Sequence, residues 1–377
     1  MTIDYNSAPN PCYILEADLL RRNLKLIKDV ETRSGATIIL AFKAFALWKA
    51  FPIVKEYFNC ATASSLSEAM LANEELGAKA HTFAPAYTDE EFPRIAALSS
   101  HLTFNSLSQF ERLHTKATGV SYGLRVNPEY SAVETDLYNP CVRGSRLGVL
   151  SDDMPKDLPK EIEGLHFHAL CEGSAEDLEN TLTAFENRFA HWIPQVKWVN
   201  FGGGHLMTRK GYNVEHLINI IKAFRKRWGV EVILEPGSAF AWQTGVLTSK
   251  VVDIVKSGDV TTALLNVSFA CHMPDCLEMP YKPNIRGAHN EPVAGLPTYR
   301  MGGNSCLAGD YVGDWSFDKP LQIGDTIVFE DMIHYTTVKT TMFNGVSHPS
   351  IAIFDAQNGG LKVVRSYDYS DYKSRMS

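Results

Sequence analysis

Three groups in the sequence have the chemistry to hold a phosphorylated aldehyde. Lys43 stands in the segment AFKAF after an apolar run, three glycines occupy 202–204, and Glu235 begins the segment EPG. A lysine amine in a partly desolvated pocket loses its proton readily and attacks carbonyl carbons. Consecutive glycines allow backbone N–H groups to converge on a phosphate. Together with the carboxylate, these features predict pyridoxal phosphate, held by Lys43 as a Schiff base.

Alternating segments along the chain predict how these residues are positioned. The first 240 residues contain eight short apolar runs, separated by longer amphipathic stretches of helical character. Seven crossovers that join eight short strands are typical of a (β/α)8 barrel, and an open doubly wound sheet is the alternative. The predicted strands are 37–42, 58–62, 81–85, 101–105, 121–127, 164–170, 198–204 and 231–237.

The pattern changes after about residue 245. β-branched segments separated by Gly, Pro, Asn and Asp replace the helical period. This pattern predicts a mainly β domain over 246–377 that follows a barrel over 17–245. Residues 1–16 include the strand-like segment NPCYILE, which we expect to pair with the β domain. The predicted fold is therefore an α/β barrel followed by a β domain.

The barrel prediction places polar residues together on one rim, because active sites lie at the C-terminal ends of barrel strands. Lys43 ends the first strand, and the sixth carries His166 and His168. The glycines 202–204 end the seventh strand and Glu235 the eighth, whose following loops usually bind phosphate in barrels. Alone, such a lysine is commonly a solvated loop residue and such a histidine a core residue. Their shared rim is what predicts a site.

Glu235 narrows the predicted chemistry. A carboxylate beside the pyridine nitrogen keeps that nitrogen protonated, so that the ring accepts electrons from Cα of the substrate. Decarboxylation requires this electron sink, whereas a racemase on the same scaffold typically has a cation at that position. The sequence therefore favours a decarboxylase over a racemase. We expect His168 to stack on the cofactor ring.

Composition excludes several classes of function. The 377 residues carry a formal net charge of −7, which disfavours nucleic acid as a partner. No apolar run reaches the roughly 18 residues of a membrane span, and the N-terminus lacks a signal-peptide pattern. Seven scattered cysteines without CxxC pairs argue against disulfides and a zinc site, so we expect no metal and a cytoplasmic protein.

Six motifs, in order along the chain, resemble those of the fold-type III pyridoxal-phosphate decarboxylases, the alanine-racemase-like group that includes ornithine and diaminopimelate decarboxylases. The resemblance runs from about residue 11 to 360 and implies a homodimer with shared active sites, in which the loop of Cys306 comes from the partner subunit. It implies a catalytic cysteine at Cys306 (GGNSCLAGD) and an acid for the distal amine of the substrate at Asp275 (SFACHMPD). The residues for which it implies a role in binding the cofactor are Lys43 (AFKAF), His168 (HFHAL), Gly203 and Gly204 (NFGGG), Glu235 and Ser238 (EPGS) and Tyr335 (HYTTVKTTMFNG).

Departures from the family pattern bear on the substrate. Ser238 replaces the arginine of the usual EPGR, Asn59 replaces a strand-two aspartate, and Leu307 replaces an acid after the cysteine. These changes disfavour ornithine and diaminopimelate as substrates. The segments EPGSAFAWQTG, MPDCLEMPYKP and CLAGDYVGDW are most similar to family members that act on carboxylated polyamines.

Acidic residues in the same segments fit a polyamine, because ammonium groups need carboxylate partners when they are partly desolvated. We expect Asp275 and Asp310, together with Glu235, to bind the substrate. We expect Cys306 to protonate Cα, since a thiol near its reference pKa can deliver a proton at neutral pH. The acids of these loops are Asp275, Glu278, Asp310 and Asp314, and the aromatic residues suited to the methylene chain are Trp242, Tyr281 and Trp315.

Three alternatives remain open at this point. The first is a decarboxylase of the same class that acts on a smaller diamino acid, namely ornithine, lysine or diaminopimelate. The second is a racemase. The third is a non-catalytic relative, either a barrel that carries the cofactor or a regulator. Carrier barrels lack the second domain and dead regulators lose the cofactor residues, whereas this chain has both.

Overall fold

The computed structural model describes residues 3–377 and divides into two compact units. The barrel unit comprises Arg22–Phe240, and the β unit comprises the residues up to Arg21 together with Ala241–Ser377. The sequence predicts divisions at residues 17 and 245, and the two compact units divide after Arg21 and after Phe240. No helix among residues 3–377 combines the length and the apolarity that crossing a membrane would require.

Parallel strands in the barrel unit form a closed ring, as the sequence predicts. The sheet order is β2-β10-β9-β8-β7-β6-β5-β4-β3, and β2 and β3 are two halves of the first predicted strand. The strand divides at Ile39, whose N–H donates to the carbonyl of Leu234, while the N–H of Leu40 donates to the carbonyl of Cys60. One half therefore pairs with the last strand and the other with the second, which closes the barrel and rules out the open sheet.

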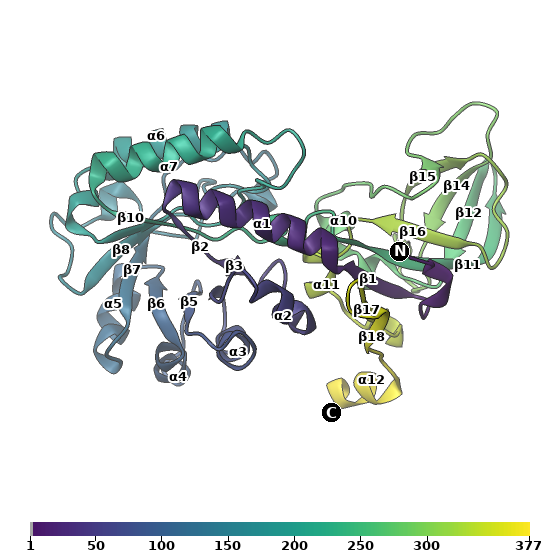
Figure 1. Ribbon diagram of the computed structural model, residues 1–377, viewed down its shortest axis with the longest axis horizontal. Coiled ribbons are helices and arrows are strands. Elements are labelled where there is room, and N and C mark those ends of the chain that lie inside the picture. Colours follow the sequence, from purple (N-terminus) through teal and green to yellow (C-terminus); the bar gives the residue numbers. More distant parts are fainter. Residues whose placement is uncertain (1–2) are drawn as a thin grey trace. The chain divides into compact units, whose positions relative to one another are not determined.

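The barrel strands are short and lie close to their predicted positions (Figure 1). They are β2 (Thr37–Ile38), β3 (Leu40–Ala41), β4 (Ala61–Ala63), β5 (Ala80–Phe83), β6 (Ser99–Phe104), β7 (Ser121–Arg125), β8 (Ile162–His166), β9 (Trp198–Asn200) and β10 (Glu231–Leu234).

Helices cover the outside of the barrel strands (Figure 1). The residues of α7 show why: Leu217, Ile218, Ile221 and Phe224 recur at helical spacing and are all buried. The connection from β7 to β8 differs from the predicted pattern, since it holds only short 3-10 turns. The helices are α1 (Ala17–Ser34), α2 (Phe51–Val54), α3 (Leu66–Leu71), α4 (Phe92–Ala97), α5 (Leu107–Leu113), α6 (Ala175–Phe189), α7 (Val214–Trp228) and α8 (Ser238–Ala241).

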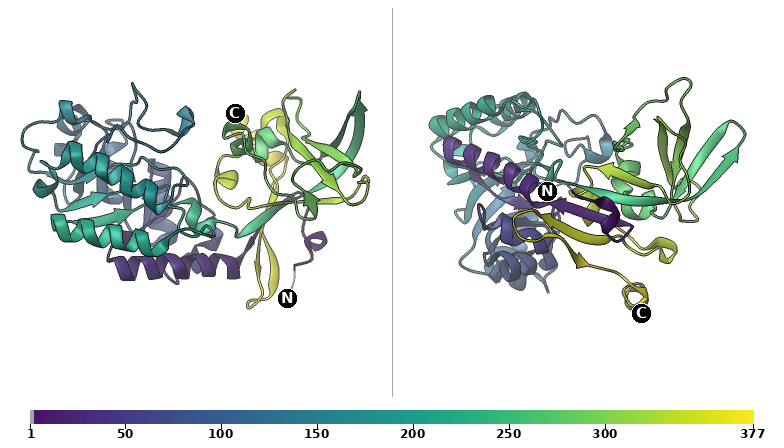
Figure 2. Two further views of the ribbon diagram at one scale, coloured as in Figure 1. Left: turned by 90° about the horizontal axis from the view of Figure 1, so that it is seen from above. Right: turned by 45° about the vertical axis from the view of Figure 1, so that its right-hand side comes forward.

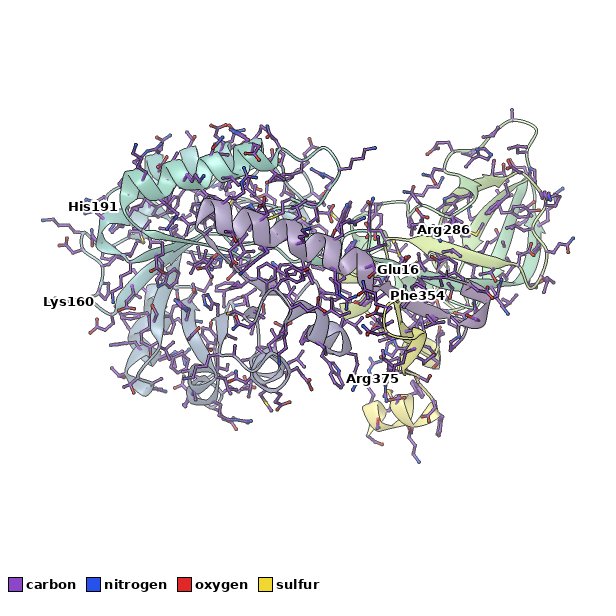
Figure 3. All side chains as sticks on the ribbon, in the orientation of Figure 1. Glu16, Lys160, His191, Arg286, Phe354 and Arg375 are labelled. Carbon is purple, nitrogen blue, oxygen red and sulfur yellow. The ribbon has the colours of Figure 1, made fainter. Side chains whose placement is uncertain are left out.

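Trp198 fills the barrel interior toward the N-terminal ends of the strands, away from the predicted rim. A Cβ on Gly164 would lie 2.1 Å from its ring, so the neighbouring strand must carry glycine there. The stacked rings of His81 and His101, with centroids 3.9 Å apart, pack beside it. Lys160, labelled in Figure 3, lies at this same end of the barrel, just before β8. The interior is therefore packed rather than hollow, and the opposite end is left for chemistry.

Strands from both ends of the chain build the β unit. Strand β1 pairs parallel with β17 and antiparallel with β11, which confirms that the N-terminal strand joins the later β segments (Figure 2). Glu16 and Phe354, both labelled in Figure 3, are in register across β1 and β17. The sheet order is β13-β15-β14-β12-β11-β1-β17-β18, and β16 also pairs with β11.

The strands of the β unit are β1 (Cys12–Glu16), β11 (Gly245–Ser257), β12 (Val260–Leu265), β13 (Ala288–His289), β14 (Thr298–Gly302), β15 (Tyr311–Phe317), β16 (Thr326–Glu330), β17 (Ser350–Asp355) and β18 (Gly360–Arg365). Its helices are the short α9 (Phe269–His272), α10 (Pro274–Glu278), α11 (Tyr335–Val338) and α12 (Tyr369–Met376).

Candidate active site

Lys43 is presented by a tight turn at the end of the first barrel strand. The carbonyl of Ala41 accepts hydrogen bonds from the N–H groups of Ala44 and Phe45, at 3.1 and 3.2 Å. Phe42 and Phe45 are fully buried on either side of the lysine. The turn and its two buried anchors therefore fix the backbone of Lys43 while its side chain points away from the core.

A hydrogen bond from the glycine loop determines the protonation state of His168. The N–H of Gly203 donates to Nδ1 of His168 at 2.7 Å, so Nδ1 must be the unprotonated ring nitrogen. The proton of the neutral ring is then on Nε2, which lies 3.1 Å from Nζ of Lys43. Because Nε2–H can only donate, Nζ must accept, and only an uncharged amine can do so. The geometry thus selects the nucleophilic form of Lys43.

Electrostatics favour the same state of Lys43. Although solvent reaches this side chain, the protein around its amine removes much of the hydration, and this desolvation lowers the pKa of Lys43. The positive charge of Arg125 acts in the same direction, against the charge of Glu235. Burial likewise holds the pKa of His168 well below its ordinary value, so the imidazole stays neutral.

Close contacts surround the glycine loop. A Cβ on Gly203 would lie 2.5 Å from the carbonyl oxygen of Glu235. A Cβ on Gly204, whose φ is +87°, would lie 2.3 Å from the carbonyl oxygen of Leu170. Only glycine fits both positions, which leaves bare backbone beside His168. Ser238, buried at the start of α8, follows the neighbouring strand. The role of Gly203, Gly204 and Ser238 in binding a phosphate stays a prediction.

Glu235 is buried among neutral hydrogen-bond donors. Nδ2 of Asn200 donates to its Oε1 at 2.7 Å, and Asn200 is oriented because its Oδ1 accepts the N–H of Gly202. Burial raises the pKa of Glu235, while the hydrogen bonds from Asn200 and from the hydroxyl of Thr62 oppose that rise. Asn200 is a site residue that the sequence argument does not assign. Its place before the glycine loop is the only signal in the sequence.

Two further polar residues lie beneath this site. Nε2 of His166 lies 3.7 Å from Oε2 of Glu235, and both ring nitrogens of His166 are buried without a hydrogen-bond partner in the part of the chain that the structure describes. Arg125 donates to the carbonyl of His168 at 3.3 Å and stacks on Phe83. Burial lowers the pKa of Arg125 to about 10. The sequence places His166 on the rim without assigning it a role, and the structure places it beside Glu235. Arg125 holds the backbone carbonyl of His168.

Cys306 lies in the β unit, on an exposed loop that is held from two sides. Its N–H donates to Oδ1 of Asn344 at 2.8 Å, and Asn344 adopts a left-handed φ of 57°. The carboxylate of Asp310 accepts from the N–H of Ala270 through Oδ1, and from the N–H and hydroxyl of Ser305 through Oδ2. Asp310 therefore uses both oxygens to shape the loop before Cys306. Its predicted role in substrate binding stays a prediction.

The other predicted acids of the β unit differ in what they bind. Asp314 pairs with Arg300 at 2.9 Å, and Glu278 pairs with Lys339. Asp275 is 5% exposed, and its Oδ1 accepts no hydrogen bond from residues 3–377. Of these acids, Asp275 therefore has a buried carboxylate oxygen that its surroundings leave unpaired.

The predicted aromatic residues also differ in what they contact. Trp315 is fully buried beneath the ammonium of Lys282, which lies 4.5 Å from its ring centroid, so it belongs to the core. Tyr281 instead donates its hydroxyl to Asp275. Tyr335, the predicted phosphate ligand, begins α11 with its ring edge against His334. Its role, and those of Cys306 and Asp275, stay predictions.

The barrel unit thus brings together Lys43, His168, Gly203 and Glu235 around one uncharged amine, at the strand ends where barrel enzymes have their active sites. The sequence pattern of the pyridoxal-dependent decarboxylase family, described for its C-terminal sheet domain, matches residues 12–333. The chain belongs to this family and is a decarboxylase.

Relatives match almost the whole chain. Carboxyaminopropylagmatine decarboxylase of Synechocystis sp. is 49% identical, with 98% of this chain and 96% of that protein covered. Carboxynorspermidine/carboxyspermidine decarboxylase of Campylobacter jejuni is 46% identical, with 98% and 99% covered. The crystal structure of carboxynorspermidine decarboxylase from Campylobacter jejuni, complexed with norspermidine, superposes with a TM-score of 0.90 over 98% of this chain and 100% of that chain.

The hydrogen bond between His168 and Lys43 predicts an unusually reactive lysine. In the apoenzyme, the pH of half-maximal acetylation of Lys43 should lie below the ~10.4 of free lysine. His168→Phe removes the donor that stabilises the neutral amine, so the midpoint should rise. Competitive labelling with mass spectrometry measures both, and surface lysines in the same sample are the control. A Lys43 profile that coincides with theirs would contradict the proposed hydrogen-bond direction.

Proposed function

We propose that this enzyme uses pyridoxal phosphate bound to Lys43 to decarboxylate carboxynorspermidine and carboxyspermidine, which yields norspermidine and spermidine. Membership of a pyridoxal-dependent family supports the cofactor, and the 46% identical relative supports the substrate. The observation that carries the proposal is the uncharged amine of Lys43 beside a glycine cradle and a buried carboxylate.

The residues of the barrel unit fit this cofactor. Lys43 would hold it covalently, Gly203, Gly204 and Ser238 would bind its phosphate together with Tyr335, and His168 would contact its ring. When bound, pyridoxal phosphate withdraws electrons from Cα of the substrate and so permits the loss of carbon dioxide. Glu235 would keep the ring nitrogen protonated, because its hydrogen bond from Asn200 favours the ionised carboxylate.

Side chains of the proposed site would also hold and deliver the protons that the reaction needs. His168 donates a hydrogen bond to the amine of Lys43 and so keeps it uncharged, which is the form that would bond to an aldehyde carbon. Cys306 would deliver the proton to Cα after carbon dioxide has left. Hydrogen bonds to Asp310 and Asn344 hold the exposed loop of Cys306 on both sides of the thiol.

Asp275 supports a substrate with a distal cation. A buried carboxylate oxygen without a donor costs about 1–3 kcal/mol, and within residues 3–377 no lysine, arginine or histidine forms an ion pair with Asp275. An ammonium group on the substrate would remove that cost. A second candidate substrate is carboxyaminopropylagmatine, which is favoured by the 49% identical relative and carries a guanidinium instead.

A homodimer with shared active sites is part of the proposal. Three large apolar side chains are exposed on and beside the loop of Cys306, namely Leu307 (47%), Tyr311 (45%) and Phe343 (50%). A second copy of the chain would cover this surface. The seven cysteines are all free, in accord with the cytoplasm as the proposed location.

Reduction with borohydride tests the cofactor and its lysine. The enzyme reconstituted with pyridoxal phosphate should show a visible absorption band that borohydride removes, and peptide mapping should place the reduced adduct on Lys43. Lys43→Ala should lose the adduct and at least about 100-fold in kcat/KM, which corresponds to roughly 2.7 kcal/mol. Turnover is measured on both carboxylated polyamines, with ornithine, lysine and diaminopimelate as controls. An adduct on another lysine, or preferred turnover of a control amino acid, would refute the proposal.

Mixing two inactive variants tests the shared sites. Lys43→Ala and Cys306→Ala are each expected to be nearly inactive. If each site takes Lys43 from one subunit and Cys306 from the other, random reassociation should restore up to about a quarter of the activity, because half of the dimers are mixed and each has one intact site. Activity is assayed after reversible dissociation, and unmixed variants treated identically are the control. No recovery, with mixed dimers shown by mass spectrometry, would place both residues in one subunit.

A further inference from the structure

The two oxygens of Asp275 have different surroundings. Oδ2 accepts a hydrogen bond from the hydroxyl of Tyr281 at 2.7 Å and another from the hydroxyl of Thr336 at 2.9 Å. Oδ1 has no hydrogen-bond partner among the described residues, and the residue is buried. One oxygen of the carboxylate is therefore satisfied by the protein, and the other is buried and unpaired.

Both hydroxyl donors are fixed. Thr336 is fully buried in α11, and Tyr281 follows α10, which carries Asp275. Burial holds the pKa of Tyr281 far above its ordinary value, so its hydroxyl keeps the proton that it donates. Neither side chain can swing into solvent without leaving Oδ2 unpaired, which is costly for a buried carboxylate.

This arrangement distinguishes two kinds of cation. A guanidinium binds a carboxylate best through two parallel N–H···O bonds, one to each oxygen. An ammonium is a compact charge and needs a single oxygen. With Oδ2 already accepting two hydrogen bonds, Asp275 has one oxygen to offer, which suits an ammonium and denies a guanidinium its second bond.

We propose that Tyr281 and Thr336 determine specificity by making Asp275 a one-oxygen acceptor that selects a terminal ammonium over a guanidinium. The inference rests on the proposed function, in which Asp275 receives the distal cation of the substrate. Carboxynorspermidine and carboxyaminopropylagmatine share their amino-acid end and their secondary amine, and they differ in the chain that follows and in its terminal group. The enzyme therefore prefers the ammonium-terminated substrate, although the 49% identical relative is named for the guanidinium compound.

The test compares both terminal groups in the cofactor-loaded enzyme and two variants. The double variant Tyr281→Phe, Thr336→Val frees Oδ2 and keeps the shape of the side chains. Thr337→Val is the matched control, because the hydroxyl of Thr337 donates to the backbone carbonyls of Ile333 and His334 and not to Asp275. We measure kcat/KM for carboxynorspermidine and carboxyaminopropylagmatine, and the Kd of the products norspermidine and aminopropylagmatine by calorimetry.

In the wild type, we expect the ammonium compound to be favoured by about 10-fold or more in both measurements, as one lost charge-assisted hydrogen bond would give. The double variant should reduce this preference by at least about 5-fold, whereas Thr337→Val should leave it unchanged. A wild-type preference for the guanidinium compound would overturn the inference. So would an unchanged ratio in the double variant, or an equal shift in the control.

Binding and turnover separate the two levels of the proposal. If neither substrate is decarboxylated but the wild type binds norspermidine more tightly than aminopropylagmatine, and the double variant loses that preference, the proposed reaction fails and the specificity inference stands. If both are decarboxylated with equal kcat/KM and equal product affinity, the proposed class of reaction stands and the inference fails.

Discussion

A single backbone N–H determines the state of the site in the barrel unit. Because Gly203 donates to Nδ1 of His168, the imidazole must present a proton from Nε2, and Lys43 must meet it as an uncharged amine. Gly203 cannot carry a side chain, since the carbonyl of Glu235 occupies that space. The glycine loop, the ring, the amine and the buried carboxylate are thus interdependent. Arg125 holds the same histidine by donating a hydrogen bond to the backbone carbonyl of His168.

Carboxylates in the β unit illustrate how position assigns a role to chemically equal groups. Asp310 accepts hydrogen bonds through both oxygens, from the N–H of Ala270 and from Ser305 in the loop before Cys306. Asp314 pairs with Arg300. Asp275 is the acid that keeps an oxygen unpaired in a buried place. Because that oxygen is buried, a cation would stabilise it. The two hydroxyl donors occupy the other oxygen of the carboxylate, so Asp275 has a single oxygen for the cation. The proposed preference for one terminal group of the substrate therefore depends on two neutral side chains, Tyr281 and Thr336.

The sequence predicts the barrel well because its strands are apolar runs that are buried on both faces, and strand ends then locate Lys43, His168 and Glu235. It also predicts that the N-terminal strand joins the β unit. Three features escape prediction because they depend on tertiary contacts. These are the division of the first strand at Ile39, the orientation of Asn200 by the N–H of Gly202, and the burial of Trp315 beneath Lys282.

The four acids of the β unit could not be ranked from the sequence for the same reason. Which of them is satisfied depends on backbone N–H groups and cations that lie distant along the chain, such as Ala270 for Asp310. The connection from β7 to β8 likewise lacks the helix that the barrel pattern implies, because its residues form 3-10 turns only.

The tautomer of His168 is the most direct test of the account, and 15N NMR of the apoenzyme labelled at histidine measures it. The resonances are assigned by their loss in His168→Gln. The account predicts an unprotonated Nδ1 and a protonated Nε2 that persist between about pH 8 and pH 6, where an ordinary histidine titrates. A protonated Nδ1, or an imidazolium that forms within that range, would contradict the donor sequence from Gly203 to His168 to Lys43.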